Sequence, residues 1–280
     1  MSIKGNMMMW AIIQEKAREQ KLPLSTVVAE VIHLIILDAL FGCPDSQSIC
    51  FQGGTSIHLL YGGYRYSEDL DFAGEFINLS LTQQLISRSK SSIEKNVIQL
   101  LGMGKCEWRF PSFSIKRRIY AIWFNFQPQG KNQKYRVKLE FARYPIYESR
   151  VMPVSSNLDI LRRRPLVTGL TAEELLAEKI TAVAGRVYIK GRDLFDLWYL
   201  SKVLSISSEV QLVKKKFEDY RVSLSISDIE QRLINYDIKK LTIELGRFLP
   251  ERYRRQLQKN DYEEIREKAV RIMKSVITNF

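Results

Sequence analysis

The chain has 280 residues, of which 45% are hydrophobic and 26% are charged. This balance is typical of a soluble globular protein, and the length allows a full core and two lobes. A membrane span needs about 18 uncharged apolar residues, and the most apolar stretch, 27–41, is interrupted by Glu30, His33 and Asp38. Three cysteines without metal-ligand spacing and only two histidines argue against a histidine-based zinc site and favour reduced thiols in a cytoplasmic protein.

The net charge of +12 is unevenly distributed along the chain. Residues 102–165 hold 14 Lys or Arg against 4 Asp or Glu, whereas residues 1–101 hold 8 against 10. A smaller excess, 16 against 11, lies in residues 213–280. Concentrated positive charge suits a polyanionic partner, so we expect contact with nucleic acid. A solvated basic surface without a partner is the alternative.

The first hundred residues are predicted to be mainly helical. Pro23 separates the first two helices, and Ser25 is a candidate N-cap for the second. The last helix of this part is expected to be capped by Ser80 or Thr82. Helices are predicted at 7–20, 25–42, 55–62 and 81–101, with one strand at 67–73.

A glycine pair opens the most informative segment of the chain. Gly53 and Gly54 follow a short apolar lead-in and precede the hydroxyl side chains of Thr55 and Ser56. Glycines allow a backbone to approach phosphate groups closely, and hydroxyls can bind them. A Gly-Gly turn alone is a weak signal, but here it stands just before a pair of carboxylates.

The two carboxylates belong to Asp69 and Asp71, which are expected on one strand. Residues i and i+2 of a strand point to the same face. Two carboxylates on one face are unfavourable unless a cation neutralises them, which indicates Mg²⁺ and a nucleoside triphosphate. A solvated strand edge is the alternative. Arg65, just before the strand, is expected to contact phosphate or to pair with Glu68.

The middle of the chain is rich in aromatic and β-branched residues and predicts antiparallel strands at 105–114, 118–127 and 134–142. Lys138 and Glu140 alternate on the last of these. If this strand pairs beside the Asp69 strand, Glu140 becomes a third carboxylate for a metal. The alternative is an ordinary charge pair on an edge strand.

From Thr171 onward the pattern is helical. We expect a boundary within 162–168, with residues 1–165 as one domain and 166–280 as a helical second one. Lys179, on the first helix after the boundary, is expected to bind triphosphate oxygens or to form a surface salt bridge. Helices are predicted at 171–186, 191–204, 207–218, 226–235, 239–248 and 261–279.

The second helix of this part opens with a basic and acidic cluster. Lys190 and Arg192 flank Asp193 and Asp196, which share one helix face at i, i+3 spacing. The cluster is expected to close over a nucleotide. Acidic residues that complement the helix dipole are the alternative.

Four motifs in this order resemble the nucleotidyltransferase family of AbiEii/AbiGii toxins, relatives of the MenT toxins of type IV toxin–antitoxin systems. They are the Gly53–Phe72 segment, Val137–Glu140, Glu173–Lys179 and Lys190–Tyr199, and the resemblance spans residues 49–200. It implies an α/β (α+β) fold with a polymerase-β-like core, a mixed sheet and an α-helical C-terminal lobe. It also implies the toxin half of a toxin–antitoxin or abortive-infection pair, with nucleotide transfer to tRNA.

The resemblance also implies roles for single residues. Asp69 and Asp71 would bind metal, joined by Glu140, and Lys179 and Asp193 would complete the catalytic set. Nucleotide contacts would come from Gly53, Gly54 and the hydroxyl of Thr55 or Ser56. Apart from the resemblance, we expect Arg65, Lys138 and Lys190 to contact the nucleotide as well.

The function expected from the sequence is transfer of a nucleoside monophosphate from a triphosphate to RNA with Mg²⁺ or Mn²⁺. Two alternatives remain: transfer to a protein or small molecule, and a non-catalytic module that binds RNA or a partner. A basic face is expected to hold the RNA through Lys116, Arg117, Arg118, Arg162, Arg163 and Arg164.

Overall fold

The computed structural model describes residues 3–114, 118–156, 158, 164–207, 209–223, 226–257 and 259–278. The chain forms two compact units. The first contains Met1–Gly62 and Tyr66–Leu170, and the second contains Gly63–Arg65 and Thr171–Phe280. The division falls at Leu170, after the predicted boundary, because Leu166–Leu170 is a strand of the first unit's sheet.

The first unit is built on a seven-stranded sheet in its described part, with strand order β3-β4-β5-β2-β1-β7-β6. The pairs β1/β7 and β2/β5 are parallel and the other neighbours are antiparallel, so the sheet is mixed, as expected. The strands are β1 (Cys50–Gln52), β2 (Asp69–Ala73), β3 (Gly104–Ser114), β4 (Ile119–Pro128), β5 (Tyr135–Ala142), β6 (Ser149–Pro153) and β7 (Leu166–Leu170).

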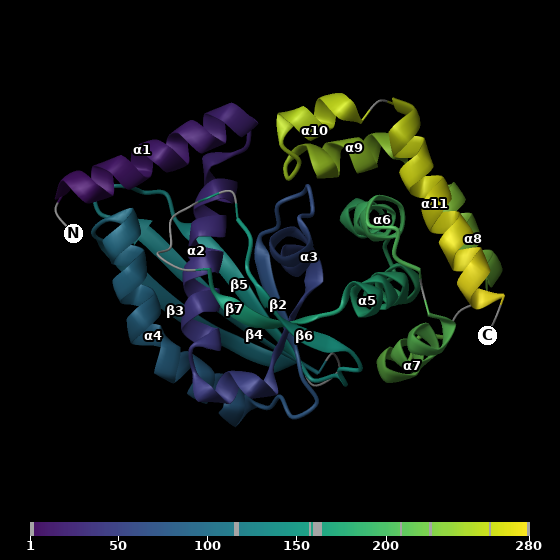
Figure 1. Cartoon of the computed structure of the whole chain (residues 1–280), viewed down its shortest axis with the longest axis horizontal. Helices are drawn as coiled ribbons and strands as arrows, with labels where there is room; N and C mark the ends of the chain where they lie inside the picture. The colour runs from purple at the N-terminus through teal and green to yellow at the C-terminus, as the bar shows by residue number, and fades with distance from the viewer. Residues whose placement is uncertain are drawn as a thin grey trace. The chain divides into compact units, whose positions relative to one another are not determined.

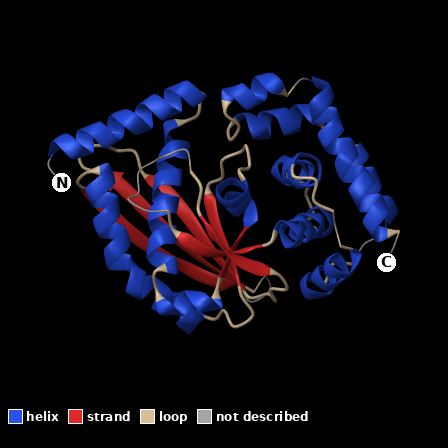
Figure 2. Cartoon of the chain, viewed as in Figure 1, coloured by secondary structure: helices blue, strands red, loops and turns tan. Residues whose placement is uncertain are grey.

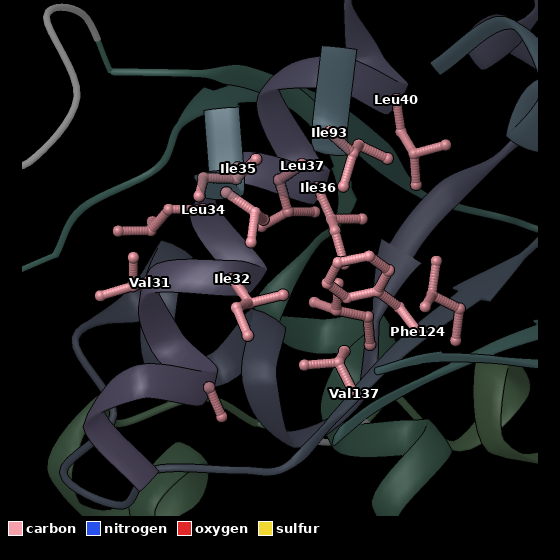
Figure 3. Packing of buried hydrophobic residues seen from close by; sticks show 14 of the residues in the cluster. Val31, Ile32, Leu34, Ile35, Ile36, Leu37, Leu40, Ile93, Phe124 and Val137 are labelled. Atoms are coloured by element: carbon pink, nitrogen blue, oxygen red, sulfur yellow. The ribbon is translucent and has the colours of Figure 1, made fainter. Parts of the chain in front are cut away.

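Helices cover one face of this sheet (Figures 1 and 2). The central one, α2, packs its apolar side chains against residues of β4 and β5, including Phe124 and Val137 (Figure 3). It is long and apolar enough for a membrane span, but 72% of it is buried inside the structure, as in the core helix of a globular domain. The helices are α1 (Ile3–Gln20), α2 (Leu24–Phe41), α3 (Gly53–Tyr61) and α4 (Leu79–Leu101), with a 3-10 turn at Pro44–Ser48.

The strand side chains alternate between this core and the opposite face. In β2, Leu70 and Phe72 are buried, and the Phe72 ring stacks on Phe141 of β5. Asp69 and Asp71 point the other way and are half-buried. The polar alternation therefore brings both carboxylates to the sheet face opposite α2.

The second unit is helical in its described part, as expected. Thr171 caps α5 through a hydrogen bond from the Glu174 amide, and α6 ends earlier than predicted, in a π-helical turn at Tyr199–Val203. The helix α10 was not predicted. The elements are α5 (Ala172–Gly185), α6 (Gly191–Trp198), α7 (Val210–Tyr220), α8 (Ile226–Ile234), α9 (Ile238–Gly246), α10 (Glu251–Gln256) and α11 (Lys259–Ile277).

Candidate active site

The register of the sheet places Asp69 and Asp71 beside β5. Asp69 is opposite Lys138 and Asp71 is opposite Glu140, in a parallel pair. Facing residues of neighbouring strands point to the same side of a sheet. The conditional expectation that the Glu140 strand lies beside the carboxylate strand is therefore confirmed.

Gly53 packs directly against one of these carboxylates. A Cβ atom added at Gly53 would lie 2.2 Å from Oδ2 of Asp71, and the residue has φ of +81°. Side-chain-bearing residues rarely adopt this conformation, and no side chain would fit beside the aspartate. The glycine thus lets the backbone at the start of α3 approach Asp71 closely.

The hydroxyls that follow the glycines are turned inward. Thr55 is 1% exposed and donates its hydroxyl hydrogen bond to the main-chain carbonyl of Asp69. Ser56 is 0% exposed and donates to the carbonyl of Gly53 at 2.9 Å. Thr55 thus holds the start of β2 at Asp69, and Ser56 closes the first turn of α3 at Gly53, whereas both hydroxyls were expected to face phosphate. The start of β2 is held further by His33, whose Nε2 lies 3.1 Å from the Glu68 carbonyl oxygen.

Glu140 does not join the two aspartates in a three-carboxylate group. Within the described ranges, no three His, Cys, Asp or Glu side chains are arranged to hold a metal ion. The Glu140 carboxylate instead forms an ion pair with Lys138, its neighbour on the same strand face. The structure thus leaves Asp69 and Asp71 as the carboxylate pair, and the charge-pair alternative describes Glu140.

The second unit contains a buried network of two carboxylates and three cations. The Lys179 ammonium lies 3.0 Å from Oδ1 of Asp193 and 2.8 Å from Oδ2 of Asp196. Arg186 pairs with the other oxygen of Asp193. Arg65 contacts Asp196 through two guanidinium nitrogens, at 2.6 and 2.5 Å.

Burial and pairing oppose each other in this network. Burial raises the pKa of Asp193, but the positive charges of Lys179 and Arg186 outweigh it and lower the value to about 2. Burial lowers the pKa of Lys179, but Asp196 and Asp193 outweigh it, so the value is raised. Lys179 and Asp193 are therefore a charged pair at neutral pH.

Two predicted nucleotide contacts, Arg65 and Lys190, belong to the second unit. Arg65 is 4% exposed and pairs with Asp196, so it neither pairs with Glu68 nor presents its guanidinium to solvent. Lys190 is exposed and forms the backbone N-cap of α6. The amide of Gly191 next to it donates to Oε2 of Glu244 at 2.8 Å, which satisfies the helix start.

Sequence reasoning missed the pairing roles of Arg186 and Asp196. The i, i+3 spacing of Asp193 and Asp196 did indicate that the two carboxylates share one helix face. Nothing in the local sequence connects Arg65 with Asp196, because 131 residues separate them.

The predicted RNA-binding residues fall mostly outside the described residues. This holds for Lys116, Arg117, Arg162 and Arg163. Arg118 has a φ of +53° and places its guanidinium 5.9 Å from the centroid of the Tyr144 ring. Arg164 is exposed.

Comparison with solved structures shows similar folds at low sequence identity. MenT4, a nucleotidyltransferase toxin from Mycobacterium tuberculosis H37Rv, aligns with a TM-score of 0.64 and 17% identity over 94% of this chain and 89% of that chain. A candidate nucleotidyltransferase from H. pylori gives 0.53 and 18% over 92% and 99%. JHP933 from Helicobacter pylori gives 0.50 and 19% over 92% and 96%.

No curated protein matches the chain. The family model described as nucleotidyl transferase AbiEii toxin, type IV TA system, matches residues 35–274 and so includes both units. This match agrees with the mixed sheet, the helical second unit and the order of the four motifs. The chain belongs to the AbiEii family of nucleotidyltransferase toxins of type IV toxin–antitoxin systems.

Proposed function

We propose that this nucleotidyltransferase moves a nucleoside monophosphate from a triphosphate to an RNA acceptor, a tRNA, and releases pyrophosphate. The observation that carries the proposal is the pair Asp69 and Asp71 on one face of β2, with the bare backbone of Gly53 against Asp71. Two adjacent carboxylates next to a glycine turn suit a cation and phosphate groups together.

A divalent metal, Mg²⁺ or Mn²⁺, fits the residues present. Carboxylate oxygens are the donors that such cations prefer, and Asp69 and Asp71 supply them from neighbouring positions of one face. The space that a Cβ of residue 53 would fill lies beside Oδ2 of Asp71. When bound, the metal would polarise the α-phosphate and lower the pKa of the acceptor hydroxyl.

The chain's own groups would do the remaining work. The main chain at Gly53 and Gly54 opens α3, and amides at a helix start favour an anion such as phosphate. In the second unit, Lys179 keeps its positive charge, which suits an anion such as phosphate. Asp196 and Asp193 hold the Lys179 ammonium at 2.8 and 3.0 Å and keep it charged, which gives both aspartates a positioning role.

The RNA acceptor is supported by charge. The +10 of residues 102–165 is more than a small acceptor needs, and RNA requires several backbone contacts at once. A cognate antitoxin as protein partner is a further part of the proposal, and the family's place in toxin–antitoxin systems supports it. Action in the cytoplasm is proposed with it.

The test is incubation of the purified protein with Mg²⁺, total tRNA and each α-labelled nucleoside triphosphate in turn. We expect label on tRNA with one or two of the triphosphates and none when the label is on the γ-phosphate. A reaction without Mg²⁺ or Mn²⁺ is the matched control. Absence of labelled RNA in all reactions would contradict the proposal.

The second candidate is transfer to a protein or a small molecule. A parallel reaction with cell extract treated with ribonuclease distinguishes it, because label would then remain on protein or on a small product. The non-catalytic alternative does not agree with membership of a nucleotidyltransferase family.

A further inference from the structure

We propose that the open face of β3, β4 and β5 binds a single-stranded end of the RNA acceptor and leads it to Asp69. This proposal rests on the proposed RNA-directed function and deepens it. This face lies on the side of the sheet opposite α2 and also carries Glu107 and Glu140. We use the term strand platform for seven of its side chains, of which Lys134 directly precedes β5: Lys105, Arg109, Trp123, Asn125, Lys134, Arg136 and Lys138.

The register aligns part of the platform with the catalytic carboxylates. Asp69 of β2 is opposite Lys138 of β5, Lys138 is opposite Trp123 of β4, and Trp123 is opposite Arg109 of β3. Neighbouring strands lie about 4.8 Å apart, so this row crosses three strand intervals, about 14 Å. A cation, an aromatic ring and a second cation thus follow one another in a line that starts at Asp69.

The charge of the platform is positive. Its five cations outnumber the two carboxylates of the same face, Glu107 and Glu140. Arg109 and Arg136 are exposed, and the side chains of Lys105 and Lys134 are 71% and 50% exposed. Glu107 pairs with both lysines, yet it cannot neutralise four cations. The remaining positive charge favours a phosphate backbone.

Trp123 adds a surface for stacking. Its ring is half-buried, and the Lys138 ammonium lies 5.6 Å from the ring centroid. An aromatic ring among cations on a sheet is the arrangement by which many proteins bind unpaired bases, because every base has a face that can stack. A duplex would not expose its bases for such stacking, so the platform fits a single-stranded end.

A hollow lies beside this row. Its volume is about 560 Å³, and Glu107, Trp108, Arg109, Asn125, Lys134 and Arg136 line it. Arg136 is oriented there by a hydrogen bond from its Nε to Oδ1 of Asn125, at 3.0 Å. Three cations around one hollow can hold a phosphate or an extruded base.

These observations favour RNA over an acidic protein surface. An acidic protein would bind through the cations alone, and a row of side chains that leads to Asp69 would add nothing to its affinity. A nucleic acid uses the cations for its phosphates, the tryptophan for a base and the row for delivery of its terminal hydroxyl to the carboxylates.

The test measures binding of a labelled single-stranded RNA oligonucleotide by fluorescence anisotropy over a range of salt concentrations. Arg109→Ala with Lys134→Ala should lower the affinity and reduce the log–log salt slope by about 1.4, because each lost contact with a single strand contributes about 0.7. Lys90→Ala with Lys95→Ala on α4 is the matched control, with the same charge loss on exposed positions of a helix that covers the other sheet face. This control should bind as the wild type does.

Trp123 tests the stacking component separately. Trp123→Ala should weaken binding roughly tenfold, whereas Trp123→Phe should retain most of the affinity. The melting temperatures of both variants are measured to show that they are folded. A lower RNA affinity of Trp123→Ala, with the affinity of Trp123→Phe retained, supports stacking. Equal affinity of wild type, the arginine–lysine double variant and Trp123→Ala would overturn the platform.

Transfer assays distinguish failure of the platform from failure of the function. If tRNA is labelled while platform variants bind RNA as the wild type does, the platform is wrong and the proposed function stands. If no RNA is labelled but platform variants lose RNA affinity, the platform is supported and the function is wrong. If only an acidic protein partner loses binding to the variants, the surface is a protein interface and the platform is overturned.

Discussion

At the scale of single residues, the candidate site depends on the absence of a side chain at position 53. Gly53 has a positive φ and leaves room for Asp71, and no other residue could do both. The sequence showed a glycine pair that allowed close approach to a ligand. It could not show that the closest neighbour is a carboxylate of the same site, because this contact depends on how β1 pairs with β2.

Gly53→Ala should therefore impair catalysis more than stability. The added methyl group meets Asp71 and must displace the carboxylate, and misplacement of a catalytic group by about 1 Å can cost on the order of 100-fold in rate. The positive φ itself should cost about 1–2 kcal/mol of unfolding free energy. Steady-state transfer rates and urea unfolding measure the two effects.

Gly130→Ala is the matched control for this prediction. Gly130 has a φ of +73°, but nothing lies within 4 Å of an added Cβ. It should show a similar loss of stability with little change in rate. An unchanged rate for Gly53→Ala, or an equal rate loss in both variants, would contradict the role given to Gly53.

Asp193 predicts a pH dependence of stability. Its pKa in the folded protein is lowered to about 2 from an ordinary value of 3.8, so the unfolded chain binds more protons in acid. The stabilisation, about 2 kcal/mol, is present above pH 4 and is lost as the pH falls toward 2. Asp193→Asn should show a smaller loss of unfolding free energy from pH 5 to pH 3 than the wild type. Parallel pH curves would show that the carboxylate is not stabilised by Lys179 and Arg186.

At the scale of elements, sequence patterns identified segments well and their ends less well. The strands that carry Asp69 and Glu140 were predicted because apolar and charged residues alternate there. The strands β1, β6 and β7 were missed, since β1 has only three residues, β6 and β7 have five each, and Pro153 ends β6. The N-caps of two helices were also misplaced. The N-cap of α2 is Pro23 and not Ser25, and the N-cap of α4 is Asn78 and not Ser80 or Thr82.

The segment Gly63–Arg65 belongs to the second unit although it lies between two elements of the first. Tyr64 stacks on Tyr253 with ring centroids 4.1 Å apart, and Arg65 pairs with Asp196 of α6. Both partners lie more than a hundred positions away in sequence, so no local pattern predicts them. The structure therefore makes α6 dependent on a residue of the Gly53–Phe72 segment.

Arg65→Met should destabilise the second unit selectively. Removal of the guanidinium deprives the buried Asp196 of one partner, a change that typically costs about 3–5 kcal/mol. Hydrogen exchange should become faster in α6 and remain unchanged in β4 and β5. Arg88→Met is the control, because Arg88 forms a similar pair with Asp45 but its side chain is 49% exposed. That change should cost less than 1 kcal/mol, and equal effects of the two variants would refute the importance of burial.

At the scale of the whole molecule, family and fold could be inferred from the sequence because four motifs keep their order. The location of the positive charge was less predictable. The RNA contacts expected from the sequence are runs of consecutive basic residues, whereas the strand platform combines single cations of β3 and β5 with Lys134, the residue before β5. Such a surface has no continuous sequence signal.

The central claim is that Asp69 and Asp71 hold the metal for nucleotidyl transfer to RNA. The most direct measurement is initial-rate transfer of α-labelled nucleotide to tRNA by the wild type, Asp71→Asn and the control Asp45→Asn, with Mg²⁺. Asp71→Asn should keep its melting temperature and lose activity on the order of 1,000-fold or more, whereas Asp45→Asn should retain it. Near-wild-type transfer by a folded Asp71→Asn protein would contradict the claim.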